Sequence, residues 1–377
     1  MSTHFNRSSV ESALTRVIDP ELRRSITELG MVEDISIEGE RLEIRILLTI
    51  AGCPMRDRLE ADIRKELASI TRDIHVTFGV MNQEQRDAVK KIVRGETKVI
   101  PFAQPGSTTR VIGIASGKGG VGKSTLTTNI AIATAKRGFN VGILDADVYG
   151  HSIPRLLNLV GQRPTAIDQL FIPPESYGVK VVSMEMFKPD RGDPIAYRGP
   201  LLHRVLEQLL TDAYWGDLDF LFIDLPPGTG DIAISLGQLI PQSEIVVVTT
   251  PQVAASEVAE RAGRIAHQLN QRILGVIENM SDFPCPSCGQ PISLFGSGGG
   301  KASADALSTL IGEHVNQIAA IPFSPELREG GDTGTPIVVR DPASPAARAI
   351  DEVVEFLMKR AQTLVGTRLK VEPTFKI

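Results

Sequence analysis

Short apolar runs rich in Val, Ile and Leu alternate with helical patterns along most of the chain beyond residue 110. The runs are continuous rather than alternating, which is typical of strands covered on both faces. Helical stretches lie between or after them, at residues 125–137, 201–210, 254–269 and 347–364. This order predicts an α/β fold with a doubly wound, mostly parallel sheet. The expected strands are residues 111–115, 141–144, 179–183, 220–223, 244–249, 273–278 and 317–321.

The chain before residue 100 follows a different pattern. Polar and apolar residues alternate at 41–46, as in a half-buried strand, and residues 54–69 carry apolar side chains at helical spacing. A further strand is expected at 74–80 and a helix at 10–17. The predicted organisation is a small α+β domain at residues 6–95, a linker at 96–109, a larger domain at 110–365 and a tail at 366–377.

Composition narrows the class of protein. The 377 residues are 42% hydrophobic and 23% charged, with a net charge of -5, so bulk charge does not favour nucleic-acid binding. Three cysteines are too few for a disulfide scaffold. No apolar run reaches the roughly 18 residues of a membrane span, and the polar N-terminus lacks a signal-peptide segment. We therefore expect a cytoplasmic protein with no membrane or nucleic-acid partner.

One glycine-rich run fits the phosphate-loop pattern G-x-x-x-x-G-K-[ST]. It follows a predicted strand and precedes a predicted helix, the context that a P-loop NTPase domain requires. Glycines let backbone N–H groups approach phosphate oxygens, Lys123 would neutralise the β- and γ-phosphates, and the Ser124 hydroxyl would hold Mg²⁺. The expected nucleotide-binding residues of the loop are Gly117, Lys118, Gly119, Gly120, Val121, Gly122, Lys123, Ser124 and Thr125.

Aspartates follow two of the predicted strands. Asp145 and Asp147 come after the second strand of the larger domain, and Asp224 follows another. An acid at a strand end beside a phosphate loop can hold Mg²⁺ or its waters, and Asp224 is the best candidate for that role. Gly228, shortly afterwards, could present its N–H to the γ-phosphate. The alternative is that such acids cap helices or stabilise turns.

Cys285 and Cys288 form a C-x-x-C pair. Two thiolates at this spacing can bind one metal or one edge of a cluster, whereas a [4Fe–4S] cluster usually needs four ligands. A two-fold dimer would supply the other two. Four thiolates across a dimer would also suit zinc, the pair could act in redox chemistry, and two unrelated surface cysteines remain the plainest reading.

Residues 118–124, 145–150 and 224–231 together resemble the Mrp/ApbC iron–sulfur carrier ATPases, over about residues 110–365. These belong to the deviant Walker A class, with the MinD and ParA ATPases and the nitrogenase iron protein. The resemblance implies that Lys118 reaches the nucleotide of a partner subunit, that Asp147 orients the attacking water and that Asp145 lies near the Mg²⁺ shell. Lys118, Lys123 and Asp147 are thus the expected catalytic residues.

The same resemblance implies that Asn279 contacts adenine and that the Cys285–Cys288 pair holds a cluster shared between subunits. Residues 6–95 resemble the small iron–sulfur assembly domain sometimes fused ahead of such ATPases, and Cys53 matches its recurrent cysteine. Cys53 would then assist cluster transfer; the alternative is a small buried apolar residue.

We expect a homodimeric carrier that uses ATP, Mg²⁺ and slow ATP hydrolysis to load or release a [4Fe–4S] cluster. It would receive the cluster from donor machinery and pass it to recipient apo-proteins. One alternative is a MinD/ParA-like positioning ATPase, in which the cysteine pair has no purpose and for which residues 367–373 make a poor membrane helix. The other is a zinc-bridged dimeric scaffold ATPase.

Overall fold

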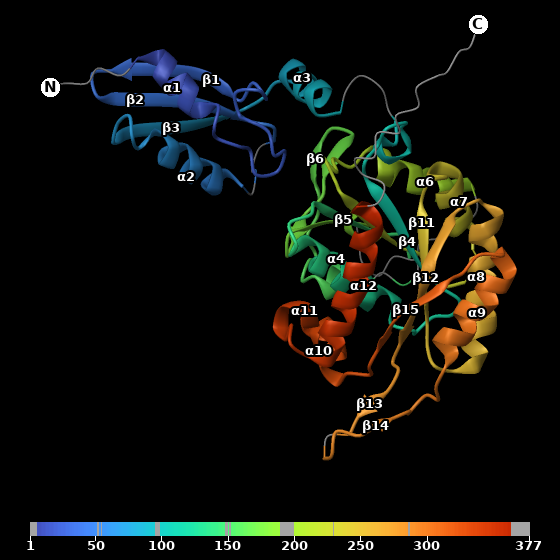
Figure 1. Ribbon diagram of the computed structural model, residues 1–377. Coiled ribbons are helices and arrows are strands. Elements are labelled where there is room, and N and C mark those ends of the chain that lie inside the picture. The colour runs from blue at the N-terminus through green and yellow to red at the C-terminus, as the bar shows by residue number, and fades with distance from the viewer. Residues whose placement is uncertain are drawn as a thin grey trace, which may run out of the picture. The chain divides into compact units, whose positions relative to one another are not determined.

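The computed structural model describes residues 6–50, 53, 55–94, 99–147, 150, 152–188, 200–228, 230–285 and 287–362 (Figure 1). The predicted tail, 366–377, lies outside these residues. The chain divides into two compact units. The smaller comprises residues 1–99, 163–174 and 210–216, and the larger comprises residues 100–162, 175–209 and 217–377.

A parallel sheet forms the centre of the larger unit, in the order β15-β12-β11-β4-β10-β5-β9-β8. All neighbouring strands are parallel except β8, which pairs antiparallel with β9. Both β5 and β10 are buried along their whole length, which explains their unbroken apolar sequences. The strands are β4 (Arg110–Ser116), β5 (Val141–Asp145), β8 (Glu175–Ser176), β9 (Val179–Ser183), β10 (Phe220–Asp224), β11 (Glu244–Thr249), β12 (Arg272–Asn279) and β15 (Asn316–Ile321).

Helices cover both faces of this sheet, so the predicted doubly wound fold is confirmed. Figure 1 shows α4 and α12 on one face and α8 and α9 on the other. In the described part of the chain no helix has the length and apolarity that a membrane span requires. The helices are α4 (Lys123–Ala135), α5 (Ile153–Leu156), α6 (Pro200–Thr211), α7 (Asp231–Leu239), α8 (Val253–Gln268), α9 (Gly299–Ile311), α10 (Pro325–Thr333), α11 (Ile337–Arg340) and α12 (Pro345–Gln362).

The smaller unit is built on a three-stranded sheet with α+β architecture. Strand β2 pairs antiparallel with β1 and parallel with β3, and its residues alternate between exposed and buried as their polarity predicts. The sequence pattern did not indicate β1 or α3. The elements are α1 (Arg7–Leu14), β1 (Val32–Glu38), β2 (Arg41–Leu48), α2 (Arg56–Leu67), β3 (Asp73–Val80) and α3 (Gln83–Arg94).

Two later segments of the chain belong to the smaller unit: the hairpin of β6 (Thr165–Ile167) and β7 (Leu170–Ile172), and residues 210–216. Thr165 Oγ1 donates to Glu21 at 2.8 Å, and the Tyr214 hydroxyl donates to the Leu22 carbonyl at 2.8 Å. These bonds tie both segments to the turn after α1.

Candidate nucleotide and metal-cargo site

The phosphate loop joins the end of β4 to the start of α4, at the carboxyl edge of the parallel sheet. Gly120 and Gly122 have φ angles of +78° and +80°, a region that L side chains rarely adopt. At Gly122 an added Cβ would lie 2.3 Å from Asn279 Nδ2. The backbone of the loop is therefore packed closely, as a phosphate cradle requires.

Lys123 and Asp224 form a buried ion pair beside this loop. Lys123 Nζ lies 2.7 Å from Asp224 Oδ1, and the side chains are 6% and 0% exposed. The ammonium has no partner in hydrogen-bonding geometry, although it is buried. A buried cation with unused donors beside helix N-terminal N–H groups suits the phosphates of a nucleotide.

Asp224 also accepts hydrogen bonds from two hydroxyls of the first turns of α4. Ser124 Oγ donates to its Oδ2 at 2.5 Å, and Thr127 Oγ1 donates to its Oδ1 at 3.0 Å. A hydroxyl and a carboxylate in contact are the oxygen ligands that Mg²⁺ prefers, so Ser124 and Asp224 fit the ion. Sequence reasoning missed Thr127, whose position one turn after Ser124 was the available signal.

Asp145 is fully buried at the end of β5. Ser183 Oγ donates to its Oδ2 at 3.0 Å, and the Asp147 N–H donates to its Oδ1 at 3.2 Å. Burial raises the pKa of Asp145 well above its usual value, and the nearby Asp224 carboxylate raises it further. The three predicted aspartates thus lie together at one edge of the sheet.

Asp147 lines a cavity of about 490 Å³. Pro227 in its wall lies near the phosphate loop, since a Cβ added at Gly119 would be 3.9 Å from Pro227 Cγ. The Gly150 N–H donates to Asp147 Oδ1 at 3.1 Å, which fixes the carboxylate. Among the described residues, the wall also includes Gly150, Leu202, Pro226, Pro227, Gly230, Asp231 and Ile232. A carboxylate at the rim of a cavity of this size can hold a water beside a phosphate.

The Gly228 N–H already has a backbone partner. It donates to the Ser116 carbonyl at 2.8 Å, and Gly228 has a φ of +90°. In this conformation the N–H is not available to a γ-phosphate. The bond instead ties the turn after β10 to the end of β4.

Lys118 points to the start of α8. Its Nζ donates to Gln252 Oε1 at 2.6 Å, and the contact is exposed to solvent. An exposed ammonium held by one neutral side chain can leave it readily. No sequence motif singled out Gln252 as a partner of Lys118.

Asn279 contacts the phosphate loop directly. Its Nδ2 donates to the Val121 carbonyl at 2.8 Å, while its Oδ1 is buried without a partner. A buried amide oxygen without a donor is costly and suits a ligand that brings an N–H group. The exocyclic amine of adenine is such a group.

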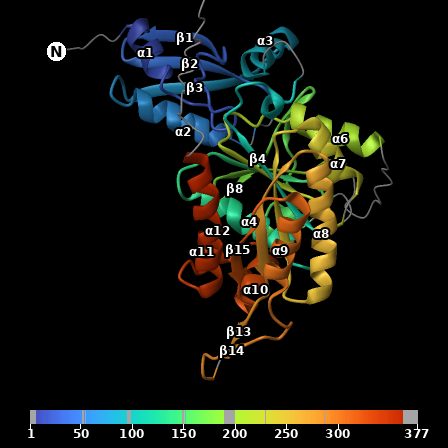
Figure 2. The ribbon, with the colours of Figure 1, turned by 45° about the vertical axis from the view of Figure 1, so that its right-hand side comes forward.

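The cysteine pair lies in a hairpin formed by β13 (Phe283–Pro284) and β14 (Pro291–Ile292). The hairpin extends away from the central sheet in both ribbon views (Figure 2). The Cys285 N–H donates to the Gln290 carbonyl at 2.9 Å, and the Gly289 N–H donates to the Cys285 carbonyl at 2.7 Å. These bonds close the turn that carries both thiols.

Cys288 is exposed and Cys285 is half-buried. The backbone N–H groups of Ser287 and Cys288, followed by the Cys288 thiol, lower the pKa of Cys285. The turn therefore favours a thiolate, the form that binds metal. In the part of the chain that the structure describes, no group of three or more His, Cys, Asp or Glu side chains could hold a metal ion.

A cluster of three aromatic rings holds the base of this hairpin. Phe323 lies just after β15. Its ring centroid is 5.8 Å from that of Phe283 on one arm of the hairpin and 5.8 Å from that of Phe295 on the other. The Phe323 N–H donates to the Asp282 carbonyl at 3.0 Å, and Ser293 Oγ donates to Asp282 Oδ1 at 2.8 Å. Both arms are thereby fixed to the sheet.

Cys53 lies in the smaller unit, half-buried beside Glu21, whose Oε2 is 3.5 Å from the sulfur. Burial, with smaller contributions from Glu21 and Asp19, raises the pKa of the Cys53 thiol to about 11. Burial therefore favours the protonated thiol at Cys53, whereas the turn at Cys285 shifts its pKa in the opposite direction.

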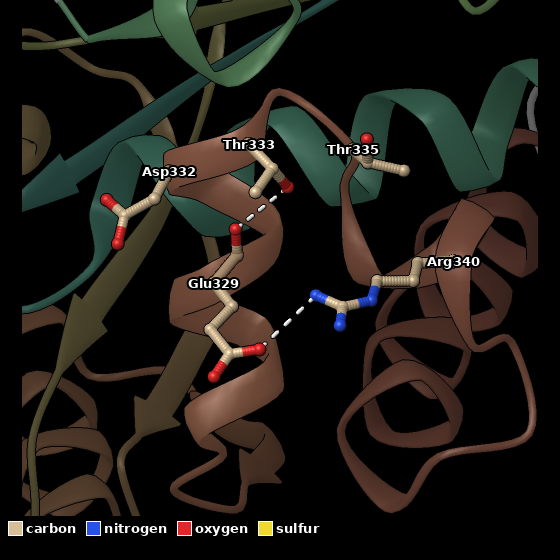
Figure 3. A pocket seen from close by; sticks show the side chains of 5 residues that line it. All are labelled: Glu329, Asp332, Thr333, Thr335 and Arg340. Atoms are coloured by element: carbon tan, nitrogen blue, oxygen red, sulfur yellow. Dashed lines mark hydrogen bonds and ion pairs between the residues drawn. The ribbon is translucent and has the colours of Figure 1, made fainter.

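A second pocket, of about 400 Å³, lies between α10 and α11 (Figure 3). Arg340 is 3.4 Å from Glu329, and the Thr333 hydroxyl donates to the Glu329 carbonyl at 2.9 Å. Asp332 is paired with Arg328 at 3.2 Å. Its charged groups already have partners, so this pocket is a weaker candidate than the phosphate loop.

A phosphate loop between a parallel strand and a helix, with a buried lysine–aspartate pair at its end, defines a P-loop nucleotide-binding protein. Residues 107–358 match the family model described as NUBPL iron-transfer P-loop NTPase, and residues 7–78 match the one described as iron-sulfur cluster assembly protein. The chain therefore belongs to the NUBPL iron-transfer P-loop NTPase family, with an iron–sulfur assembly domain ahead of it.

Two relatives that align with nearly the whole chain are both called iron-sulfur cluster carrier protein. The chain is 49% identical over 373 residues to the iron-sulfur cluster carrier protein of Mycobacterium leprae, covering 98% of this chain and 97% of that protein. It is 33% identical over 382 residues to the protein of the same name from Helicobacter pylori, covering 98% of each. The predicted resemblance to iron–sulfur carrier ATPases is confirmed.

One solved structure is similar to this chain over most of its own length. The nucleotide-binding protein of Archaeoglobus fulgidus, solved in complex with ADP and with cobalt found in it, is 35% identical with a TM-score of 0.52. The similarity covers 60% of this chain and 88% of that one.

Proposed function

We propose that this chain is an ATP-hydrolysing carrier that binds a [4Fe–4S] cluster between two copies of itself and transfers it to apo-proteins. The observation that carries this proposal is the Cys285–Cys288 pair, presented on a projecting hairpin of the same unit that holds the phosphate loop. The names of the relatives support the cargo, and the ADP-bound relative supports the nucleotide.

Two thiols from each of two subunits meet the four-ligand requirement of the cluster. Neighbouring N–H groups lower the pKa of Cys285 and favour ligation. Ile292 and Leu294 are 42% and 51% exposed beside the pair, so contact between two hairpins would bury apolar surface as well.

At the nucleotide, Lys123 and the N–H groups of the loop would neutralise the phosphates, and Lys118 would leave Gln252 to reach the partner's nucleotide. Asp147 would orient the attacking water in its cavity. Mg²⁺, when bound by Ser124 and Asp224, supplies further compensation of phosphate charge. Asn279 would accept the adenine amine at its unpaired oxygen. We further propose that the protein acts in the cytoplasm, where it receives the cluster from donor machinery and passes it to recipient apo-proteins.

Anaerobic reconstitution with iron and sulfide tests the cargo. We expect a brown protein with broad absorption and one cluster per two chains, lost in Cys285→Ser and Cys288→Ser and kept in the matched control Cys53→Ser. Bound zinc without iron would indicate the zinc-bridged scaffold instead. Transfer to an apo-protein should respond to ATP, and an equal response in Lys123→Ala would refute the coupling to hydrolysis.

A further inference from the structure

The last two residues of β12 connect the nucleotide site to the cysteine hairpin. Side chains of neighbouring strand residues point to opposite faces of a sheet. Asn279 contacts the phosphate loop at the Val121 carbonyl, on the face that α4 covers. Glu278 contacts the first turn of α9 on the other face, where the Gly300 N–H donates to its Oε2 at 2.5 Å.

The contact between Glu278 and α9 is tight and dry. Glu278 is 5% exposed, and its carboxylate lies at the positive end of a helix of 13 residues. A Cβ added at Gly300 would lie 2.7 Å from Glu278 Cβ, and one added at Gly299 would lie 2.4 Å from the Thr250 carbonyl oxygen. Two glycines thus allow the helix to begin directly against the strand ends.

This contact closes the base of the segment that carries the cysteines. Residues 281–298 leave the sheet after β12 and return at the start of α9, with Cys285 and Cys288 between these ends. The bond from Gly300 to Glu278 fixes the return point relative to the departure point. A shift of Asn279 would therefore move the Glu278 backbone and the base of the hairpin with it.

We propose that Glu278 is a positioning residue that transmits the nucleotide state from Asn279 to the cysteine hairpin, by holding the first turn of α9 against the end of β12. This inference rests on the proposed function for the identity of the cargo. Its structural content, a coupling between the nucleotide site and residues 281–298, does not require a bound cluster.

Hydrogen exchange of residues 281–298 in the full chain, with and without Mg²⁺ and ADP, tests the coupling. In the wild type we expect ADP to change the exchange rate by about fivefold or more, the lower range of allosteric coupling. In Glu278→Ala the ratio should fall to about one, while ADP affinity changes by less than about threefold. Glu278→Gln, which keeps an oxygen acceptor, should restore the effect.

Glu352→Ala, an exposed glutamate on α12, is the matched control and should behave as the wild type. Glu278→Asp, shorter by one methylene, replaces the alanine variant if melting shows that the latter does not fold. An unchanged ADP effect in Glu278→Ala, or in Glu278→Asp where it takes its place, would overturn the inference, as would no ADP effect in the wild type. Cluster loading is measured separately, so failure of the carrier function leaves the exchange result readable.

Discussion

Lys123 Nζ lies 2.7 Å from Asp224 Oδ1, and the two side chains are 6% and 0% exposed. The cost of desolvating both charges offsets much of their attraction, so an intact buried pair adds little net stability. Removing one partner is different, because it leaves the other charge buried and uncompensated. Asp224 therefore serves the folded state as well as the proposed Mg²⁺ site.

Asp224→Ala should lower the free energy of unfolding by about 3–5 kcal/mol, because the Lys123 ammonium would remain buried without its counter-charge. Urea denaturation followed by circular dichroism measures the change. Arg137→Ala is the control, because Arg137 and Asp351 pair at 3.0 Å with side chains 26% and 42% exposed. Its cost should be below about 1 kcal/mol, and equal costs would contradict the buried-pair argument.

Local sequence patterns predicted the strands of the central sheet, the phosphate loop and the aspartates at the strand ends. The seven expected strands all lie in the central sheet. A continuous apolar run is typical of a parallel strand that is buried on both faces. The phosphate loop lies at the expected edge, since motif and flanking elements agree. The three aspartates could be predicted as site residues because each follows the end of a predicted strand.

Long-range contacts could not be predicted in this way. Nothing in the periodicity of residues 163–174 connects Thr165 to Glu21, which is 144 residues away. The sequence around Phe323 likewise does not indicate that its ring packs against those of Phe283 and Phe295. The bond from the Gly228 N–H to Ser116 depends on a turn conformation that residue types leave open.

Gly122→Ala should weaken ADP binding more than an alanine substitution at another glycine with a positive φ. Its φ of +80° is unfavourable for alanine, and the new Cβ would lie 2.3 Å from Asn279 Nδ2, displacing the contact with Val121. Gly138→Ala is the control, with a φ of +90° and open space around it. That control should cost about 1–2 kcal/mol and keep ADP affinity. Calorimetric titration of ADP should show at least about a tenfold loss only for Gly122→Ala.

Gln252→Glu should slow ATP hydrolysis, because a carboxylate 2.6 Å from Lys118 Nζ would hold the ammonium in its own subunit. Gln252→Ala, which releases Lys118, should hydrolyse ATP at least as fast as the wild type. The steady-state kcat at saturating ATP is the measurement, with Lys118→Ala as the inactive reference. Equal rates for the glutamate and alanine variants would show that the contact does not restrain Lys118.

Cys285 should be alkylated much faster than Cys53 at about pH 8, because the pKa of Cys285 is lowered and that of Cys53 is raised to about 11. Cys53 has a higher pKa in the folded chain than in the unfolded chain, so burial favours its protonated form. Its contribution to stability is complete below its unfolded pKa of about 8.5 and is lost as the pH rises through about 11.

Iodoacetamide labelling followed by mass spectrometry of the two peptides measures both rates from pH 7 to 10. The Cys53 rate should rise throughout this range, whereas the Cys285 rate should level off first, since its thiolate forms at lower pH. Cys288→Ser should reduce the advantage of Cys285 only in part, because the backbone donors remain. Parallel pH profiles for Cys53 and Cys285 would mean that the turn at 285–288 does not stabilise a thiolate, and the metal-ready state of the hairpin would have to come from the partner subunit.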